Sequence, residues 1–197
     1  MLSPIITVFM YFPLKTFINF IVMFGIAFFA YRRLRRLYRN GLIAKRCAIA
    51  EWLLVFYIEL LFFFSVFGRR SWSYYRYHLE VGWSYRSWLE SGDMDMLKQI
   101  LLNIVLFIPV GVLAAYIIKR HKFIKAICLG LLITVTIECL QLVMRTGNFE
   151  FDDMINNALG VAIGAISVAG YYYVLRLRSK STKTGPSGNS EEADEIR

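Results

Sequence analysis

The sequence predicts an all-α integral membrane protein, a bundle of about five transmembrane helices with the N-terminus outside and the C-terminus inside. Hydrophobic residues make up 57% of the 197 positions, whereas a soluble domain averages roughly 45–50%. The excess is concentrated in runs of about twenty residues, the length that a helix needs to cross the hydrocarbon core. The five runs cover residues 11–31, 47–67, 97–118, 123–144 and 153–175.

Each run has features that support its assignment. The first lacks the basic segment and the small-residue cleavage site of a signal peptide, so we expect it to remain as a membrane anchor. The second carries Glu59, and the third contains Pro109, which removes a backbone hydrogen bond and can kink a helix. The fourth and fifth are separated by a short connection, which predicts that they are antiparallel neighbours.

The basic residues predict the orientation of the bundle. The net charge is +9, and the basic residues gather after the first, third and fifth runs, which the positive-inside rule assigns to the cytoplasm. Because these charges flank apolar runs, membrane lipids are the expected partners and nucleic acid is not. The three cysteines form no C-x-x-C pair, so neither a disulfide framework nor a zinc site is indicated.

The chain divides into a transmembrane domain and a tail. Residues 1–178 are expected to form the membrane domain, and residues 179–197 a disordered cytoplasmic tail, because that segment is too polar to bury a core. The loop at 68–96 is rich in tryptophan and tyrosine, which favour the lipid headgroup zone. It is either a surface that contacts lipid or carbohydrate, or a simple interfacial belt.

Polar residues gather near the outer ends of the last three runs, where their burial requires a reason. Glu138, Gln141 and Arg145 share one helix face, and Glu138 lies roughly 9 Å below the predicted outer surface. The facing surfaces carry further acids and amides, so the sequence predicts an outward-facing polar pocket, to which Glu59 also contributes. Gln99 lies at a comparable depth. The residues expected to bind a ligand are Asn103, Glu138, Gln141, Arg145, Asp152, Asp153 and Asn157.

Structural roles also fit several of these residues. Asp152 and Asp153 suit a helix N-terminus, where a carboxylate meets free N–H groups. Arg145 suits a helix C-terminus and can pair with Asp152. Glu138 either ties helices together by hydrogen bonding or contacts a ligand. No bound metal or cofactor is expected.

Three sequence motifs resemble the VanZ-like family. Residues 103–111 fit its N-x-x-L-F-x-P-x-G span, beginning at Asn103. Residues 138–160 fit its E-x-x-Q, R and D-x-x-x-N-x-x-G signature, which includes Glu138, Arg145 and Asp153. The three motifs occur in the right order on the right runs, and the resemblance covers about residues 55–170.

The resemblance implies a small, multi-pass protein of the bacterial plasma membrane. The family is named for a protein that confers low-level resistance to the glycopeptide teicoplanin, and related members are linked to lipoglycopeptide tolerance. We therefore expect a non-enzymatic cell-envelope protein whose pocket binds an amphiphile, a lipid-linked envelope precursor or a glycopeptide. The alternative is a membrane enzyme acting on a lipid-linked envelope substrate, with Glu138 as acid/base and Asp152 and Asp153 as metal ligands.

Overall fold

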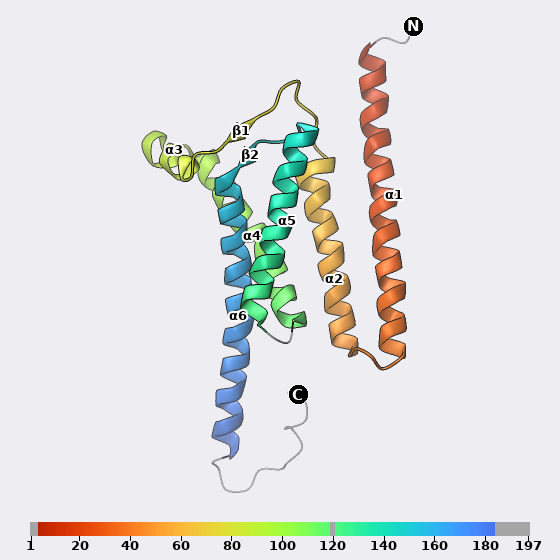
Figure 1. Ribbon diagram of the computed structural model, residues 1–197, viewed down its shortest axis with the longest axis vertical. Coiled ribbons are helices and arrows are strands. Elements are labelled where there is room, and N and C mark those ends of the chain that lie inside the picture. Colours follow the sequence, from red (N-terminus) through yellow and green to blue (C-terminus); the bar gives the residue numbers. More distant parts are fainter. Residues whose placement is uncertain (1–3, 119–120, 184–197) are drawn as a thin grey trace.

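The computed structural model describes residues 4–118 and 121–183, with side chains described for 17–118 and 121–180. Helices dominate it (Figure 1). The elements in chain order are α1 (Pro4–Arg39), α2 (Lys45–Phe62), the π-helical turn η1 (Phe63–Phe67), β1 (Tyr77–His78), α3 (Trp83–Ser91), α4 (Met94–Ile117), α5 (Lys122–Met144), β2 (Phe149–Glu150) and α6 (Phe151–Lys183).

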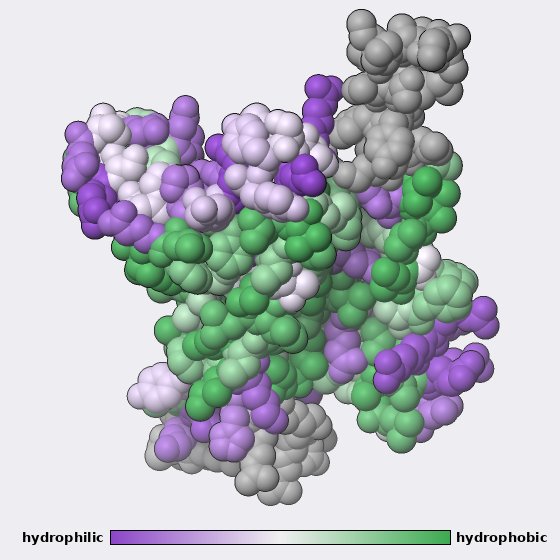
Figure 2. Space-filling view, turned by 45° about the horizontal axis from the view of Figure 1, so that its top comes forward, coloured by the Kyte–Doolittle hydropathy of each residue, from purple (hydrophilic) through white to green (hydrophobic). Residues whose placement is uncertain are grey.

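Five helical segments are long and apolar enough to cross a membrane, which confirms the predicted spans. They are Phe17–Arg39, Lys45–Phe67, Met94–Ile117, Lys122–Met144 and Phe151–Lys180. An apolar band lies between the two ends of the molecule, which are more hydrophilic (Figure 2). Such a band is expected of a bundle whose sides contact lipid and whose ends contact water.

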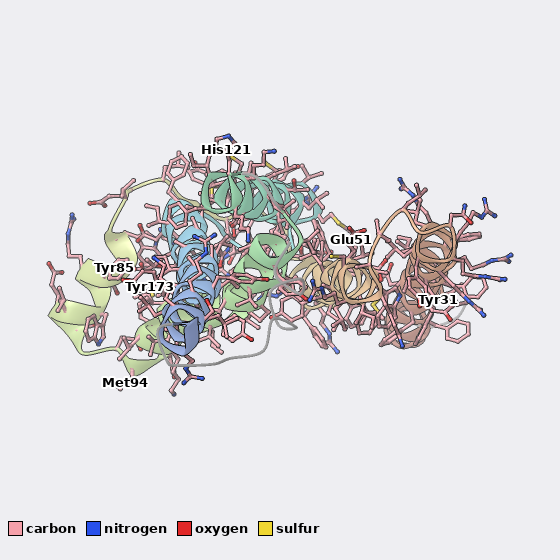
Figure 3. All side chains as sticks on the ribbon, turned by 90° about the horizontal axis from the view of Figure 1, so that it is seen from below. Tyr31, Glu51, Tyr85, Met94, His121 and Tyr173 are labelled. Carbon is pink, nitrogen blue, oxygen red and sulfur yellow. The ribbon has the colours of Figure 1, made fainter. Side chains whose placement is uncertain are left out.

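The core of the bundle is formed by α4, α5 and α6, and the most extensive helix pair is α4 with α6. Val110, Ile133, Ile137 and Val161 are among the buried side chains at its centre. The helix α2 packs against α4, and α1 packs against α2. Viewed from below, α1 and α2 lie side by side at one edge of the molecule, with Tyr31 and Glu51 marking them (Figure 3).

Close contact between α4 and α6 depends on glycine. A Cβ atom at Gly160 would lie 2.1 Å from the carbonyl oxygen of Ile104, and one at Gly111 would lie 2.1 Å from that of Val161. A Cβ atom at Gly164 would meet the backbone of α4 at a similar distance. The G-x-x-x-G pair of α6 is therefore used for packing within the bundle, where small residues let two backbones approach.

Two helices extend beyond their predicted ends. The helix α1 continues to Arg39, so the arginines predicted to form a loop lie on its last two turns. Arginine and leucine are good helix formers, and no glycine interrupts this segment before Gly41. The helix α6 continues to Lys183, past the expected domain boundary at 178. The remainder of the predicted disordered tail lies outside the described residues. Pro109 is accommodated within a continuous α4.

The aromatic loop folds back onto the connection between α5 and α6. Its strand β1 pairs in parallel with β2, with Tyr77 opposite Phe149 and His78 opposite Glu150. The backbone N–H of Trp72 also donates to the backbone carbonyl oxygen of Arg145 at 2.7 Å. These contacts, which the sequence pattern did not predict, fix the loop across the end of the bundle that lies opposite the basic end of α1 (Figure 1).

Candidate functional site: a polar pocket at one end of the bundle

A pocket of about 940 Å³ opens at the end of the bundle that the aromatic loop covers. Residues of η1, the loop, α4, α5, β2 and α6 line it. The positive-inside rule predicts that this end faces outward. Five of the predicted ligand-binding residues line the pocket: Asn103, Glu138, Gln141, Asp153 and Asn157. Gln99 also lines it.

Two buried glutamates lie side by side in the pocket wall. Glu138 is 2% exposed, and its Oε2 accepts a hydrogen bond of 3.0 Å from the Glu150 backbone N–H. Glu150 is 1% exposed, and its Oε1 accepts a hydrogen bond of 2.9 Å from Asn148 Nδ2. Glu138 therefore does tie elements together, as one of its two predicted roles required, and it also lines the pocket.

The amide side chains hold neighbouring elements against the pocket. Gln141 donates through Nε2 to the Ser65 carbonyl oxygen at 3.0 Å, which joins α5 to η1. Asn157 donates through Nδ2 to Thr134 Oγ1 at 2.7 Å, which joins α6 to α5. Each amide thus uses its donor group for packing, and the Asn157 oxygen is left on the pocket wall.

Several buried polar atoms of the pocket lining lack a hydrogen-bond partner within the described residues. They are Asn103 Nδ2, Thr146 Oγ1, Asn148 Oδ1, Glu150 Oε2 and Asn157 Oδ1. Buried polar groups are almost always hydrogen-bonded to protein or to ordered water, because an unmade bond costs about 1–3 kcal/mol. A concentration of such atoms around one cavity indicates that a polar ligand or water satisfies them.

Positive side chains also line the pocket: Arg69, Arg70, Arg76 and Lys98. Arg69 lies within electrostatic range of both Glu138 and Asp153. The Arg76 guanidinium lies 4.8 Å from the centroid of the Trp72 ring. Lys98 pairs with Asp95 at 2.7 Å, and both side chains are largely exposed. The pocket therefore combines buried carboxylates with cations that reach solvent.

The structure places Arg145 away from the pocket lining. Its backbone is left-handed, with φ of 54°, and it ends α5. Its Nη1 donates to the Ser73 carbonyl oxygen at 3.2 Å, and its guanidinium lies 4.8 Å from the centroid of the Tyr75 ring. The helical spacing that linked Arg145 to Glu138 does not apply, because α5 ends at Met144 and the Arg145 backbone is no longer helical. Its side chain holds the aromatic loop instead.

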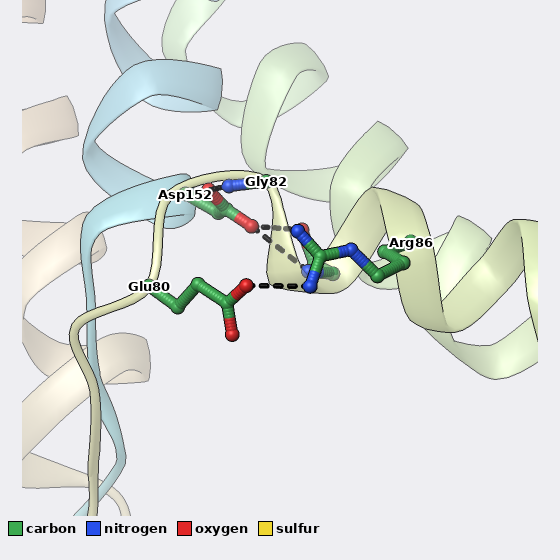
Figure 4. Close-up of polar contacts among 5 residues, drawn as sticks. Glu80, Gly82, Arg86 and Asp152 are labelled. Atoms are coloured by element: carbon green, nitrogen blue, oxygen red, sulfur yellow. Dashed lines mark hydrogen bonds and ion pairs between the residues drawn. The ribbon is translucent and has the colours of Figure 1, made fainter.

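Asp152 also lies outside the pocket lining. It is fully buried, and its carboxylate accepts hydrogen bonds from Gly82 N (2.6 Å), Ser84 N (2.9 Å) and Ser84 Oγ (2.6 Å) (Figure 4). Asp152 was predicted to suit the start of its own helix, but it caps the N-terminus of α3, which favours negative charge. Adjacent helix positions differ by about 100° in direction, so Asp153 reaches the pocket while Asp152 does not.

The helix α3 has a second attachment to α6. The Tyr85 hydroxyl donates to Asn156 Oδ1. Burial, together with the nearby Asp152 charge, raises the pKa of Tyr85 above its ordinary value. By contrast, the Arg86–Glu80 ion pair on the same segment is exposed, with the two groups 2.5 Å apart (Figure 4). The buried contacts therefore position α3, and the exposed pair adds little.

Other predicted features of the site differ in position. The described pocket lining does not include Glu59, whose two carboxylate oxygens are buried on α2 without a hydrogen-bond partner in the described part of the chain. Nor do the described residues contain a group of three or more His, Cys, Asp and Glu side chains able to hold a metal ion. Three donors already occupy the Asp152 carboxylate, so Asp152 offers a metal ion fewer free lone pairs than Asp153 does.

Sequence reasoning missed Glu150 and the cations of the loop. Glu150 precedes α6 and belongs to no helical face, so helical spacing gave no signal for it. Its proximity to Glu138 depends on the β1–β2 pairing. Arg69 and Arg76 occur in the aromatic loop, and a mixed charge pattern alone did not indicate that they would return to the bundle.

The fold and the pocket define a multi-pass helical membrane protein with a polar cavity at one end of its bundle. The sequence matches the model of the VanZ/LLP1 family over residues 20–175. The chain therefore belongs to the VanZ/LLP1 family, in agreement with the motif resemblance. No curated protein and no solved structure matches it significantly.

Proposed function

We propose that the chain binds the polar headgroup of a membrane amphiphile in this pocket. Through this binding it contributes to glycopeptide (teicoplanin) and lipoglycopeptide tolerance at the bacterial plasma membrane. The observation that carries the proposal is that one cavity joins two different surfaces. One consists of buried polar atoms that lack partners among the described residues, and the other consists of apolar side chains open to lipid.

The polar part of the cavity supports a headgroup ligand. Glu150 Oε2 and Asn157 Oδ1 are buried acceptors that have no partner among the described residues. A ligand that donates hydrogen bonds to them recovers the free energy lost on their burial. Ordered water does the same when the pocket is empty.

The apolar part supports a ligand with hydrocarbon chains. Leu102 and Leu106 line the pocket, yet they are 56% and 42% exposed on the side of α4. Both lie within the membrane-spanning part of α4. An amphiphile whose headgroup occupies the pocket can therefore extend its acyl chains along these leucines into the bilayer.

The direct test compares lipid binding by purified full-length protein and its Asp153→Asn variant. Asp153 lines the pocket, as does Gln99 near it. A hydrogen bond to a charged group contributes about 1.5–3 kcal/mol, so we expect binding to weaken roughly ten- to a hundredfold. Glu80→Gln is the matched control, because it makes the same chemical change in an exposed ion pair at the same end of the molecule.

The cellular test uses the same two variants in a susceptible bacterium. We expect Glu80→Gln to preserve any tolerance to teicoplanin that the unmodified chain confers, and Asp153→Asn to abolish it at an equal amount of protein in the membrane. Full tolerance in the Asp153→Asn strain, or loss of tolerance only together with loss of protein, contradicts the proposal.

A further inference from the structure

We propose that the bound headgroup carries a primary ammonium group and a phosphate, as in an aminophospholipid. This inference rests on the proposed function and names the chemical class of its ligand. The ammonium group lies among the buried acceptors of the pocket, and the phosphate lies near its cations.

The unpartnered atoms of the pocket point to the ammonium group. Three of them can only accept a hydrogen bond, whereas the Thr146 hydroxyl can also donate one: Asn148 Oδ1, Glu150 Oε2 and Asn157 Oδ1. A primary ammonium group has three N–H donors and no acceptor. It therefore offers one donor for each of these atoms, a match that neither a carboxylate nor a phosphate provides.

The carboxylates of the pocket favour the same group. Glu138, Glu150 and Asp153 all line the cavity. Glu138 and Asp153 both lie within electrostatic range of Glu150. Charged groups inside a protein require compensation by an opposite charge or by hydrogen bonds. A cationic group placed among three carboxyl groups supplies both, and its hydrogen bonds to them are strengthened by charge.

The phosphate is assigned to the cationic side chains. Arg69, Arg76 and Lys98 line the pocket together with the exposed leucines. Arginine binds phosphate through paired N–H donors, and lysine binds it as a point charge. The Asp95–Lys98 pair does not prevent this, because both of its side chains are largely exposed and an exposed pair is weak. Asn103 Nδ2 adds a buried donor for a phosphate or ester oxygen.

This arrangement discriminates among lipid headgroups. Choline carries a quaternary ammonium group with no N–H, so it leaves the three acceptors unmatched. Glycerol offers hydroxyl donors without positive charge, so it does not compensate the carboxylates. The pocket should therefore prefer phosphatidylethanolamine to phosphatidylcholine and phosphatidylglycerol of the same acyl chains.

The experiment measures the affinity of the purified full-length protein for these three dioleoyl lipids by native mass spectrometry. We expect phosphatidylethanolamine to bind at least about tenfold more tightly than either of the others. We also expect Glu150→Gln to remove most of this preference while changing phosphatidylcholine binding little. Glu80→Gln is the control, and it should keep the preference. The comparison of lipids on the unmodified protein needs no variant, so it stands even if Glu150→Gln fails to fold.

The outcomes separate this inference from the proposed function. Equal affinity for the three lipids, or tighter binding of phosphatidylglycerol, overturns the ammonium assignment and leaves headgroup binding intact. Absence of binding by any lipid overturns both. Soluble phosphoethanolamine is included as a fourth ligand. If phosphoethanolamine binds more weakly than phosphatidylethanolamine, the ligand is a membrane lipid. If the two bind equally tightly, the assignment of a membrane lipid is contradicted.

Discussion

The substitution Gly160→Ala tests the packing that holds the pocket together. A Cβ atom at this position would lie 2.1 Å from the Ile104 carbonyl oxygen, and real Cβ atoms essentially never approach another heavy atom closer than 3.0 Å. The helices α4 and α6 must therefore separate by roughly 1 Å, and such overpacking costs about 1–3 kcal/mol. Gly170→Ala is the matched control on the same helix, because nothing lies within 4 Å of its Cβ position.

The two alanine variants are expected to differ in stability. Alanine favours helix over glycine by up to about 1 kcal/mol, so Gly170→Ala should be neutral or stabilising. Because the same gain applies to both variants, Gly160→Ala should be less stable than Gly170→Ala by the overpacking cost alone, about 1–3 kcal/mol. Denaturant unfolding of the purified proteins, followed by tryptophan fluorescence, measures the difference. If Gly160→Ala is as stable as Gly170→Ala, the close contact of α4 with α6 is refuted.

Three further predictions concern α3 and the orientation of the bundle. Asp152→Ala removes three hydrogen bonds to the start of α3, so hydrogen exchange within α3 should accelerate at least about a hundredfold while α4 and α5 stay protected; unchanged exchange would contradict the capping role. Because burial and the Asp152 charge raise the pKa of Tyr85 above its ordinary value of 10.0, the stability that Tyr85 contributes is present below pH 10 and is lost as pH rises through the raised pKa. The phenolate absorbance that disappears in Tyr85→Phe should accordingly titrate above pH 10, and titration at or below pH 10 argues against the burial of Tyr85 beside Asp152. A cysteine at exposed Glu90 should react with an impermeant reagent added outside intact cells, whereas one at exposed Asn40 should not; the reverse pattern inverts the assigned topology.

The five spans could be predicted because hydrophobic length is a property of each segment alone. The pocket face of α5 was also predictable, because Glu138 and Gln141 lie one turn apart on an uninterrupted helix. The same reasoning failed at Arg145, where the left-handed backbone ends the helix and sends the side chain to the aromatic loop. It could not separate Asp152 from Asp153, since either one fits the start of a helix.

The remaining parts of the site depend on contacts between distant segments. Asp152 meets Gly82 and Ser84 across 70 and 68 positions of the chain. The Glu150 backbone N–H donates to the Glu138 carboxylate, and the pairing of β2 with β1 holds the Glu150 backbone in place. Short strands of two residues carry no periodicity of their own, so no sequence pattern marked them.

The sequence by itself determined the class of membrane protein, the number of spans and the polar faces of its last three helices, because length, hydrophobicity and helical spacing are local. The tertiary structure alone decided which polar residues share the pocket. It folds the aromatic loop back over the bundle, turns Arg145 and Asp152 to hold that loop, and adds Glu150 and the loop arginines to the cavity. The physical reason is that hydrogen bonds between distant segments direct these side chains, and such bonds form only once the helices have packed.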